Sequence, residues 1–155
     1  MILEGPKQPL REALGEARTA LGERFPSVVV DNASHSPALG YWLGAVLLHD
    51  VQPEDDGVIR GQARSDLMLS IVCLQTVRST AADREDQQHN VFRTTVLLAV
   101  AYEMLKAEEA AVQAVSLIDS MAEENPVLEG SFPVLVDGHR EKYEAVEQRL
   151  AGQAK

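Results

Sequence analysis

The chain has 155 residues, of which 45% are hydrophobic and 25% charged, so its composition excludes an intrinsically disordered protein and indicates one soluble domain over residues 1–155. Its longest uncharged apolar run, 38–48, is too short to span a membrane. The net charge of −10 repels phosphates and anionic lipids, so we expect no nucleic acid and no membrane among its partners.

The N-terminal third predicts two helices and a connector. Apolar periodicity indicates an amphipathic helix over 9–24, which Pro26 ends. The run 27–32 (SVVVDN) resembles a strand, and because no partner strand is predicted we expect an extended connector docked on the bundle. A second helix is expected from Ser36, as N-cap, through position 48, with Pro37 at its first helical position.

Residues 62–125 contain neither glycine nor proline, the two residues that most strongly interrupt helices. The residues of this run are mainly good helix formers, which again predicts helix. The expected helices are a third from between Pro53 and Val58 to about Ser79, a fourth at 90–106 and a fifth at 107–124, the last two either separate or continuous.

The C-terminal part follows a break at Asn125–Pro126. Residues 126–137 are expected to form an irregular apolar crossing, and Asp137 to cap a last helix that ends near position 150. Together the elements predict an all-α fold, a compact bundle of five to six helices.

The segments 38–48, 67–74 and 96–101 are apolar around the whole helix, so these central helices must be covered on all faces. Three amphipathic helices can hardly wrap three apolar ones, so either the central helices form a tight inner layer or one uncovered face is buried against a second copy of the chain. We therefore expect a homodimer that buries one face, with a ligand pocket lined by the same face as the alternative.

The segment Leu47-Leu48-His49-Asp50 resembles part of the HD-domain metal-dependent phosphohydrolases, in which an apolar helix ends in His-Asp. The resemblance covers residues 44–51. It implies an all-helical fold, a divalent metal that activates water, and His49 and Asp50 as metal ligands. The alternative interpretation is an ordinary helix end at which His49 interacts with the last carbonyls.

Three charged residues interrupt or border the apolar helices. Asp66 precedes 67–74, Arg93 precedes 96–101, and Glu103 follows it. Because an unpaired buried charge is costly, each must be exposed, paired or functional. If they face one interior space, they are candidate catalytic residues for general acid–base chemistry; an ordinary ion pair between Asp66 and Arg93 is the alternative.

Four aromatic residues near these charges, Tyr41, Trp42, Phe92 and Tyr102, are the predicted walls of an apolar pocket. The first hypothesis is therefore a protein that binds a small organic molecule between its helices, either with or without a catalysed reaction. The alternatives are a non-catalytic homodimeric interaction or regulatory module and an HD-like phosphohydrolase. No cofactor is expected, except a divalent metal in the last case.

The single cysteine, Cys73, excludes a disulfide framework, and the N-terminus shows no secretory signal pattern. We therefore expect a cytoplasmic protein. Arginine outnumbers lysine ten to four, a bias typical of high-GC bacterial genomes.

Overall fold

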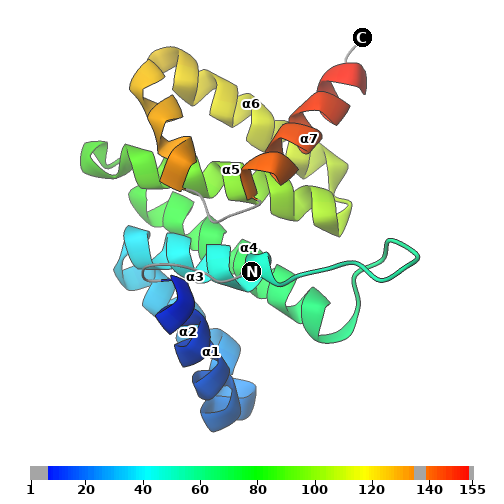
Figure 1. Ribbon diagram of the computed structural model, residues 1–155. Helices are drawn as coiled ribbons and strands as arrows, with labels where there is room; N and C mark the ends of the chain where they lie inside the picture. The colour runs from blue at the N-terminus through cyan, green and yellow to red at the C-terminus, as the bar shows by residue number, and fades with distance from the viewer. Residues whose placement is uncertain (1–6, 135–138, 154–155) are drawn as a thin grey trace.

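Within residues 7–134 and 139–153, which the computed structural model describes, all regular secondary structure is helical (Figure 1). The predicted all-α fold is confirmed. The α-helices are α1 (Lys7–Leu21), α2 (Phe25–His35), α3 (Pro37–His49), α4 (Gly61–Ala81), α5 (Gln88–Leu105), α6 (Glu108–Glu124) and α7 (His139–Gln153), with the 3-10 segments η1 (Gly22–Arg24), η2 (Glu85–Gln87) and η3 (Pro126–Val134).

The start of α3 is as predicted from the sequence. Ser36 has an extended backbone, and its hydroxyl oxygen accepts a 3.3 Å hydrogen bond from the backbone N–H of Leu39. Pro37 occupies the first helical position, where its missing N–H leaves no hydrogen bond unmade.

The prediction of an extended connector at 27–32 is wrong, because this segment lies inside α2. Phe25, Val29 and Ala33 are spaced four residues apart, so they share one face of a helix. All three are buried, in a cluster with residues of α3 and α4. Burial of this face therefore overrides the β-propensity of the three consecutive valines.

The third predicted helix begins later than expected, at Gly61, which starts α4. The segment ahead of it, in which the helix was expected to begin, forms a loop instead. Gly57 N–H donates to the Glu54 carbonyl at 2.8 Å, and an Asp56 carboxylate oxygen accepts from Val58 N–H at 3.0 Å. Arg60 pairs with both Glu54 and Asp56, which fixes the loop ahead of the helix.

The fourth and fifth predicted helices are separate. Lys106 has a left-handed backbone (φ 65°), and its N–H donates to the Glu103 carbonyl while Ala107 N–H donates to the Tyr102 carbonyl. These bonds end α5 and let α6 return beside it. The crossing expected at 126–137 contains η3, and the predicted Asp137 cap lies outside the described residues.

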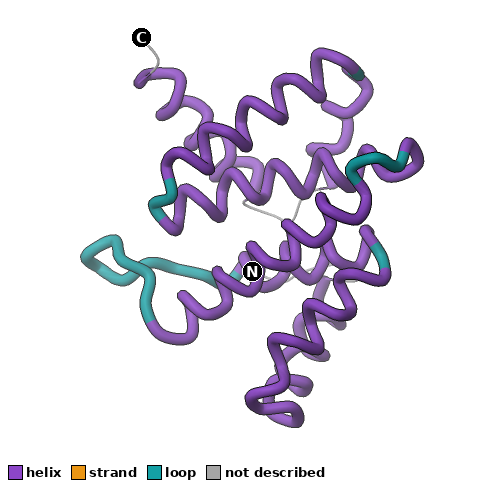
Figure 2. Tube along the Cα trace, turned by 180° about the vertical axis from the view of Figure 1, so that it is seen from behind, coloured by secondary structure: helices purple, strands orange, loops and turns teal. Residues whose placement is uncertain are grey.

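Helices α3 and α4 lie in the middle of the molecule, between α1 and α2 on one side and α5, α6 and α7 on the other (Figures 1 and 2). The larger buried cluster joins α3 and α4 to the C-terminal helices. A smaller one joins them to α1 and α2. Of the three segments predicted to be central, 38–48 and 67–74 lie in α3 and α4, and 96–101 lies in α5, where all six residues are buried. No helix in the described part is long and apolar enough to cross a membrane.

The crossing of α3 and α4 depends on two glycines of α3. A Cβ atom added at Gly40 would lie 2.4 Å from Cγ2 of Val77, and one added at Gly44 would lie 2.5 Å from Cδ2 of Leu74. Cβ atoms essentially never come this close to a non-bonded atom. The absence of side chains at these positions therefore allows the two backbones to approach closely.

Candidate functional site

The three predicted catalytic residues have different partners. Asp66 accepts hydrogen bonds from Arg18 at 2.7 Å and from Gln62 at 2.9 Å. Arg93 donates to the side chain of Asn90, and its guanidinium lies 4.2 Å from the ring centre of Tyr41. The structure does not join the three through hydrogen bonds or ion pairs.

Glu103, the third of these residues, is paired with Arg149 of α7, which also pairs with Glu108 at 3.1 Å. These contacts attach the C-terminal helix to the end of α5 and the start of α6. The ion pair between Asp66 and Arg93, which was the alternative, is not formed either, because Asp66 pairs with Arg18.

The four predicted pocket aromatics occupy several environments. Tyr41 and Phe92 are fully buried, and Trp42 packs edge-on against Tyr41 with ring centres 5.1 Å apart. Tyr102 lines a cavity of about 420 Å³ between α4, α5 and α6. Phe92 lines a different cavity, of about 380 Å³, beside α6 and α7.

The predicted metal ligands lie at the end of α3. Nδ1 of His49 is 3.3 Å from Oδ1 of Asp50, and Oδ2 of Asp50 accepts a 2.8 Å hydrogen bond from Arg11. Among the described residues, no three His, Cys, Asp or Glu side chains are grouped so that they could hold a metal ion. The metal role of His49 and Asp50 stays a prediction.

A second histidine, His139 at the start of α7, lies beside this pair. Its ring centre is 6.1 Å from that of His49, and the side chain is completely buried. Neither ring nitrogen has a hydrogen-bond partner among the residues that the structure describes. Burial, aided by Lys142 and His49, lowers the pKa of His139 to about 3, so the imidazole is neutral at pH 7.

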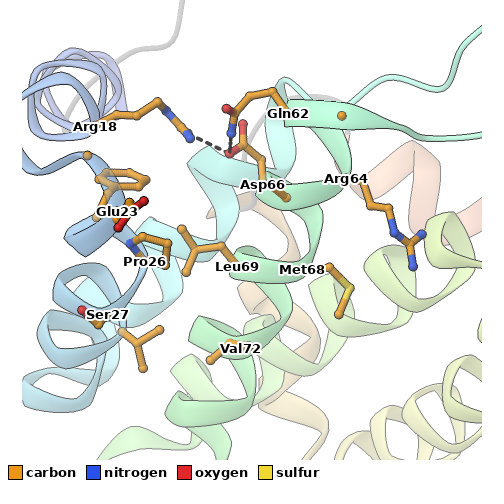
Figure 3. Close-up of a pocket in the computed structure, with 15 residues that line it drawn as sticks. Arg18, Glu23, Pro26, Ser27, Gln62, Arg64, Asp66, Met68, Leu69 and Val72 are labelled. Carbon is orange, nitrogen blue, oxygen red and sulfur yellow. Dashed lines mark hydrogen bonds and ion pairs between the residues drawn. The ribbon is translucent and has the colours of Figure 1, made fainter.

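A groove of about 1080 Å³ lies between α1 and α2 on one side and α4 on the other. Leu69 extends from α4 toward Pro26 of α2 in Figure 3. Met68 and Val72 remain 41% and 39% exposed, large fractions for apolar side chains on a helix. The apolar lining consists of Phe25, Pro26, Val30, Met68, Leu69 and Val72.

One end of this groove is polar. Arg18 reaches from α1 to Asp66 on α4, and Gln62 bonds to the same carboxylate from one helical turn earlier (Figure 3). Both bonds go to Oδ1 of Asp66, which leaves Oδ2 without a donor among the described residues. The guanidinium of Arg18 also lies 4.6 Å from the ring centre of Phe25, a cation–π distance that holds the arginine in place.

Two further charged residues line the groove without a side-chain partner in the described part of the chain, Glu23 in η1 and Arg64 in α4. Glu23 lies on the side of the groove formed by α1, η1 and α2, and Arg64 lies on the side formed by α4. The groove therefore combines an apolar surface with a fixed, partly shielded ion pair and two solvated charges of opposite sign.

The sequence pointed to Asp66 as a candidate residue but expected it beside a pocket walled by four aromatic residues, none of which lines this groove. Arg18 and Gln62 were missed. Gln62 precedes Asp66 by four residues, a spacing that allows side-chain hydrogen bonding on a helix and was a readable signal. Arg18 is 48 residues from Asp66. Its role depends on how the fold places α1 relative to α4, and no local pattern encodes that.

In comparisons with known proteins, no family model, no curated protein and no solved structure matches this chain.

Proposed function

We propose that this protein binds a small organic molecule in the groove between α1, α2 and α4. The observation that carries the proposal is the pairing of exposed Met68 and Val72 with the positioned carboxylate of Asp66 in one concave surface. Ligand sites in proteins are typically concave, mostly apolar, and contain a few fixed polar groups.

The dimensions support a ligand of moderate size. Protein cavities that hold such molecules have volumes of about 300–1,000 Å³, and the groove, at about 1080 Å³, is slightly larger than this range. Its apolar lining suits a hydrocarbon or aromatic body placed along Met68, Leu69 and Val72. Removing those side chains from water on binding would supply most of the free energy.

The polar end suits a ligand that carries a hydrogen-bond donor. Arg18 and Gln62 hold Oδ1 of Asp66, so the carboxylate is already oriented when a ligand arrives. Oδ2 can then accept a hydrogen bond from an amine, amide or hydroxyl group. Acid–base roles for Arg93 and Glu103 are not part of this proposal, because each is engaged with a partner elsewhere.

Native mass spectrometry of the purified protein, without added metal, tests this proposal first. A bound organic molecule should add a defined mass to the chain, and the Val72→Glu variant should lose it. Val112→Glu is the matched control, since Val112 is a similarly exposed helical valine (44%) outside the groove. Equal ligand retention by both variants would contradict the location.

A fragment screen by protein-observed NMR tests the polar end if no molecule is carried through purification. Amine-bearing aromatic fragments should shift the amide signals of α2 and α4. Asp66→Asn should weaken their binding about tenfold, because a hydrogen bond to a charged acceptor is worth about 1.5–3 kcal/mol. Fragments that bind Asp66→Asn as tightly as the wild type would exclude the carboxylate as the recognition group.

The second candidate function is a non-catalytic homodimeric module. Val112 and Leu117 are 44% and 43% exposed on the outer side of α6, where they line a shallow hollow. Exposed apolar side chains gathered on one helix are typical of association surfaces. Sedimentation should then show a dimer that dissociates in the double variant Val112→Glu/Leu117→Glu, and a monomeric wild type would exclude it.

We place the proposed activity in the cytoplasm. The support is the single cysteine of the sequence, Cys73, which is buried and unpaired.

A further inference from the structure

Arg78, in the last turn of α4, differs from most arginines of this protein. Six arginines pair with carboxylates in the described residues, namely Arg11, Arg18, Arg60, Arg84, Arg140 and Arg149. Arg24, Arg64 and Arg93 have no such partner in this part of the chain either, but Arg24 and Arg64 are exposed to water and Arg93 lies over the ring of Tyr41. Arg78 is partly buried, and its one side-chain hydrogen bond within the described part of the chain goes to the neutral hydroxyl of Thr95.

The Thr95 hydroxyl cannot offset this charge. It donates to the Val91 carbonyl at 2.7 Å and accepts from Arg78, so its hydrogen-bonding is already committed. A guanidinium has five N–H donors, and most of those of Arg78 remain available. A cation withdrawn from water without a counter-ion is costly, so the site favours an anion.

The available donors of Arg78 adjoin a cavity of about 420 Å³ between α4, α5 and α6. Its ten lining residues include no aspartate or glutamate, although the chain contains 24 of them. The cavity is therefore a positively charged site in a protein of net charge −10. Its apolar wall is formed by Leu98, Ala110, Ala114 and Leu117.

A second donor faces the same cavity. The hydroxyl of Tyr102 accepts a 2.8 Å hydrogen bond from Nε2 of Gln75. Because the oxygen serves as acceptor in that bond, the Tyr102 O–H proton is available to a ligand. Arg78 and Tyr102 thus provide N–H and O–H donors from α4 and α5 at the edge of an apolar hollow.

We infer that this cavity binds a small organic monocarboxylate, whose carboxylate contacts Arg78 and Tyr102 and whose short apolar chain lies against α6. A planar carboxylate matches the two-pronged geometry of a guanidinium. The apolar wall favours an organic acid over inorganic phosphate. This site is separate from the groove between α1, α2 and α4, and neither proposal depends on the other.

Titration with sodium hexanoate, followed by protein-observed NMR, tests the inference on the full chain. Hexanoate should bind saturably, and hexanamide, which has the same shape without the charge, should bind at least tenfold more weakly. Inorganic phosphate should bind more weakly than hexanoate. Absence of saturable hexanoate binding at millimolar concentration, or equal binding of hexanamide, would overturn the inference.

The variants Arg78→Gln and Arg24→Gln remove the same charge from the cavity and from an exposed surface position. The first should weaken hexanoate binding at least tenfold, and the second should leave it unchanged. Tyr102→Phe removes only a hydroxyl group and should weaken binding severalfold, which provides a second test if Arg78→Gln does not fold. Retention of full affinity by Arg78→Gln or by Tyr102→Phe would contradict the assignment.

Discussion

The hydroxyl of Ser70 in α4 donates a 2.7 Å hydrogen bond to the backbone carbonyl of Gly44 in α3, and both residues are completely buried or nearly so. The bond satisfies a polar side chain in the centre of the molecule. It is made to the same glycine whose lack of a side chain leaves room for Leu74 of α4, so Gly44 and Ser70 belong to one close contact between the two helices.

Gly44→Ala should therefore destabilise the protein by about 1–3 kcal/mol, the usual cost of overpacking a well-packed core. The new methyl group would lie 2.5 Å and 2.6 Å from Cδ2 and Cγ of Leu74, so the Leu74 side chain or the helices would have to shift. Gly15→Ala in α1 is the matched control, because no atom lies within 4 Å of its added Cβ. It should stabilise by about 0.5–1 kcal/mol, and chemical denaturation measures both.

Lys106→Gly should raise the free energy of unfolding by about 0.5–1 kcal/mol. Lys106 ends α5 in the left-handed conformation, which is unfavourable for a residue with a Cβ atom and costs glycine almost nothing. Lys142→Gly within α7 removes the same side chain from a helix interior and should destabilise by about 1 kcal/mol. Thermal and urea unfolding of the two variants should thus change in opposite directions.

Stability should fall as the pH drops below about 6.5, in part because of His139. Burial holds its folded-state pKa at about 3, against 6.5 when exposed, so the unfolded chain binds a proton that the folded chain does not. The loss is complete only near pH 3 and amounts to about 2 kcal/mol at pH 5. The groups that face His139 and add to this effect are His49 and Lys142.

The variant His139→Leu removes this titration and should show a weaker loss of stability between pH 7 and pH 5. His35→Gln, at the exposed end of α2, should leave the wild-type dependence intact. Urea unfolding at the two pH values gives the comparison. Parallel pH profiles for wild type and His139→Leu would show that His139 is not buried in its neutral form.

Cys73 should resist thiol reagents in the folded protein. It is fully buried, and burial raises its pKa to about 12, so the thiolate is almost absent at pH 8. Ellman's reagent should react with it slowly in buffer and at once in denaturant. Rapid reaction of the folded protein would contradict its place in the core.

The fold was predicted from the sequence better than the site was. Helix formation is signalled by interactions between residues close in the sequence, whereas the site depends on contacts between distant helices. Ser36 and Pro37 define a helix start through contacts within four residues, and a run without glycine or proline favours helix locally. The prediction for the valines of α2 was wrong because their β-propensity is a local property. Their helical conformation is stabilised by burying one helix face against α3 and α4, and this face consists of Phe25, Val29 and Ala33.

The candidate site was predicted only in part, for the same reason. Asp66 was identified as a charge at the edge of an apolar helix, which is a local property. Its partner Arg18 and the separate environments of Arg93 and Glu103 are set by how distant helices pack. Charge spacing along a chain does not determine which of several helices will supply the counter-ion.

The division of the buried residues into two clusters has a consequence for motion. Helices α1 and α2 contribute buried side chains only to the smaller cluster, whereas α3 and α4 belong to both. The amide protons of α1 and α2 should thus exchange with deuterium sooner than those of α5, because this part can open without disrupting the larger cluster. The wall of the groove formed by α1 and α2 can open while the wall formed by α4 stays fixed. A ligand bound in the groove should therefore slow amide exchange in α1 and α2 relative to the ligand-free protein.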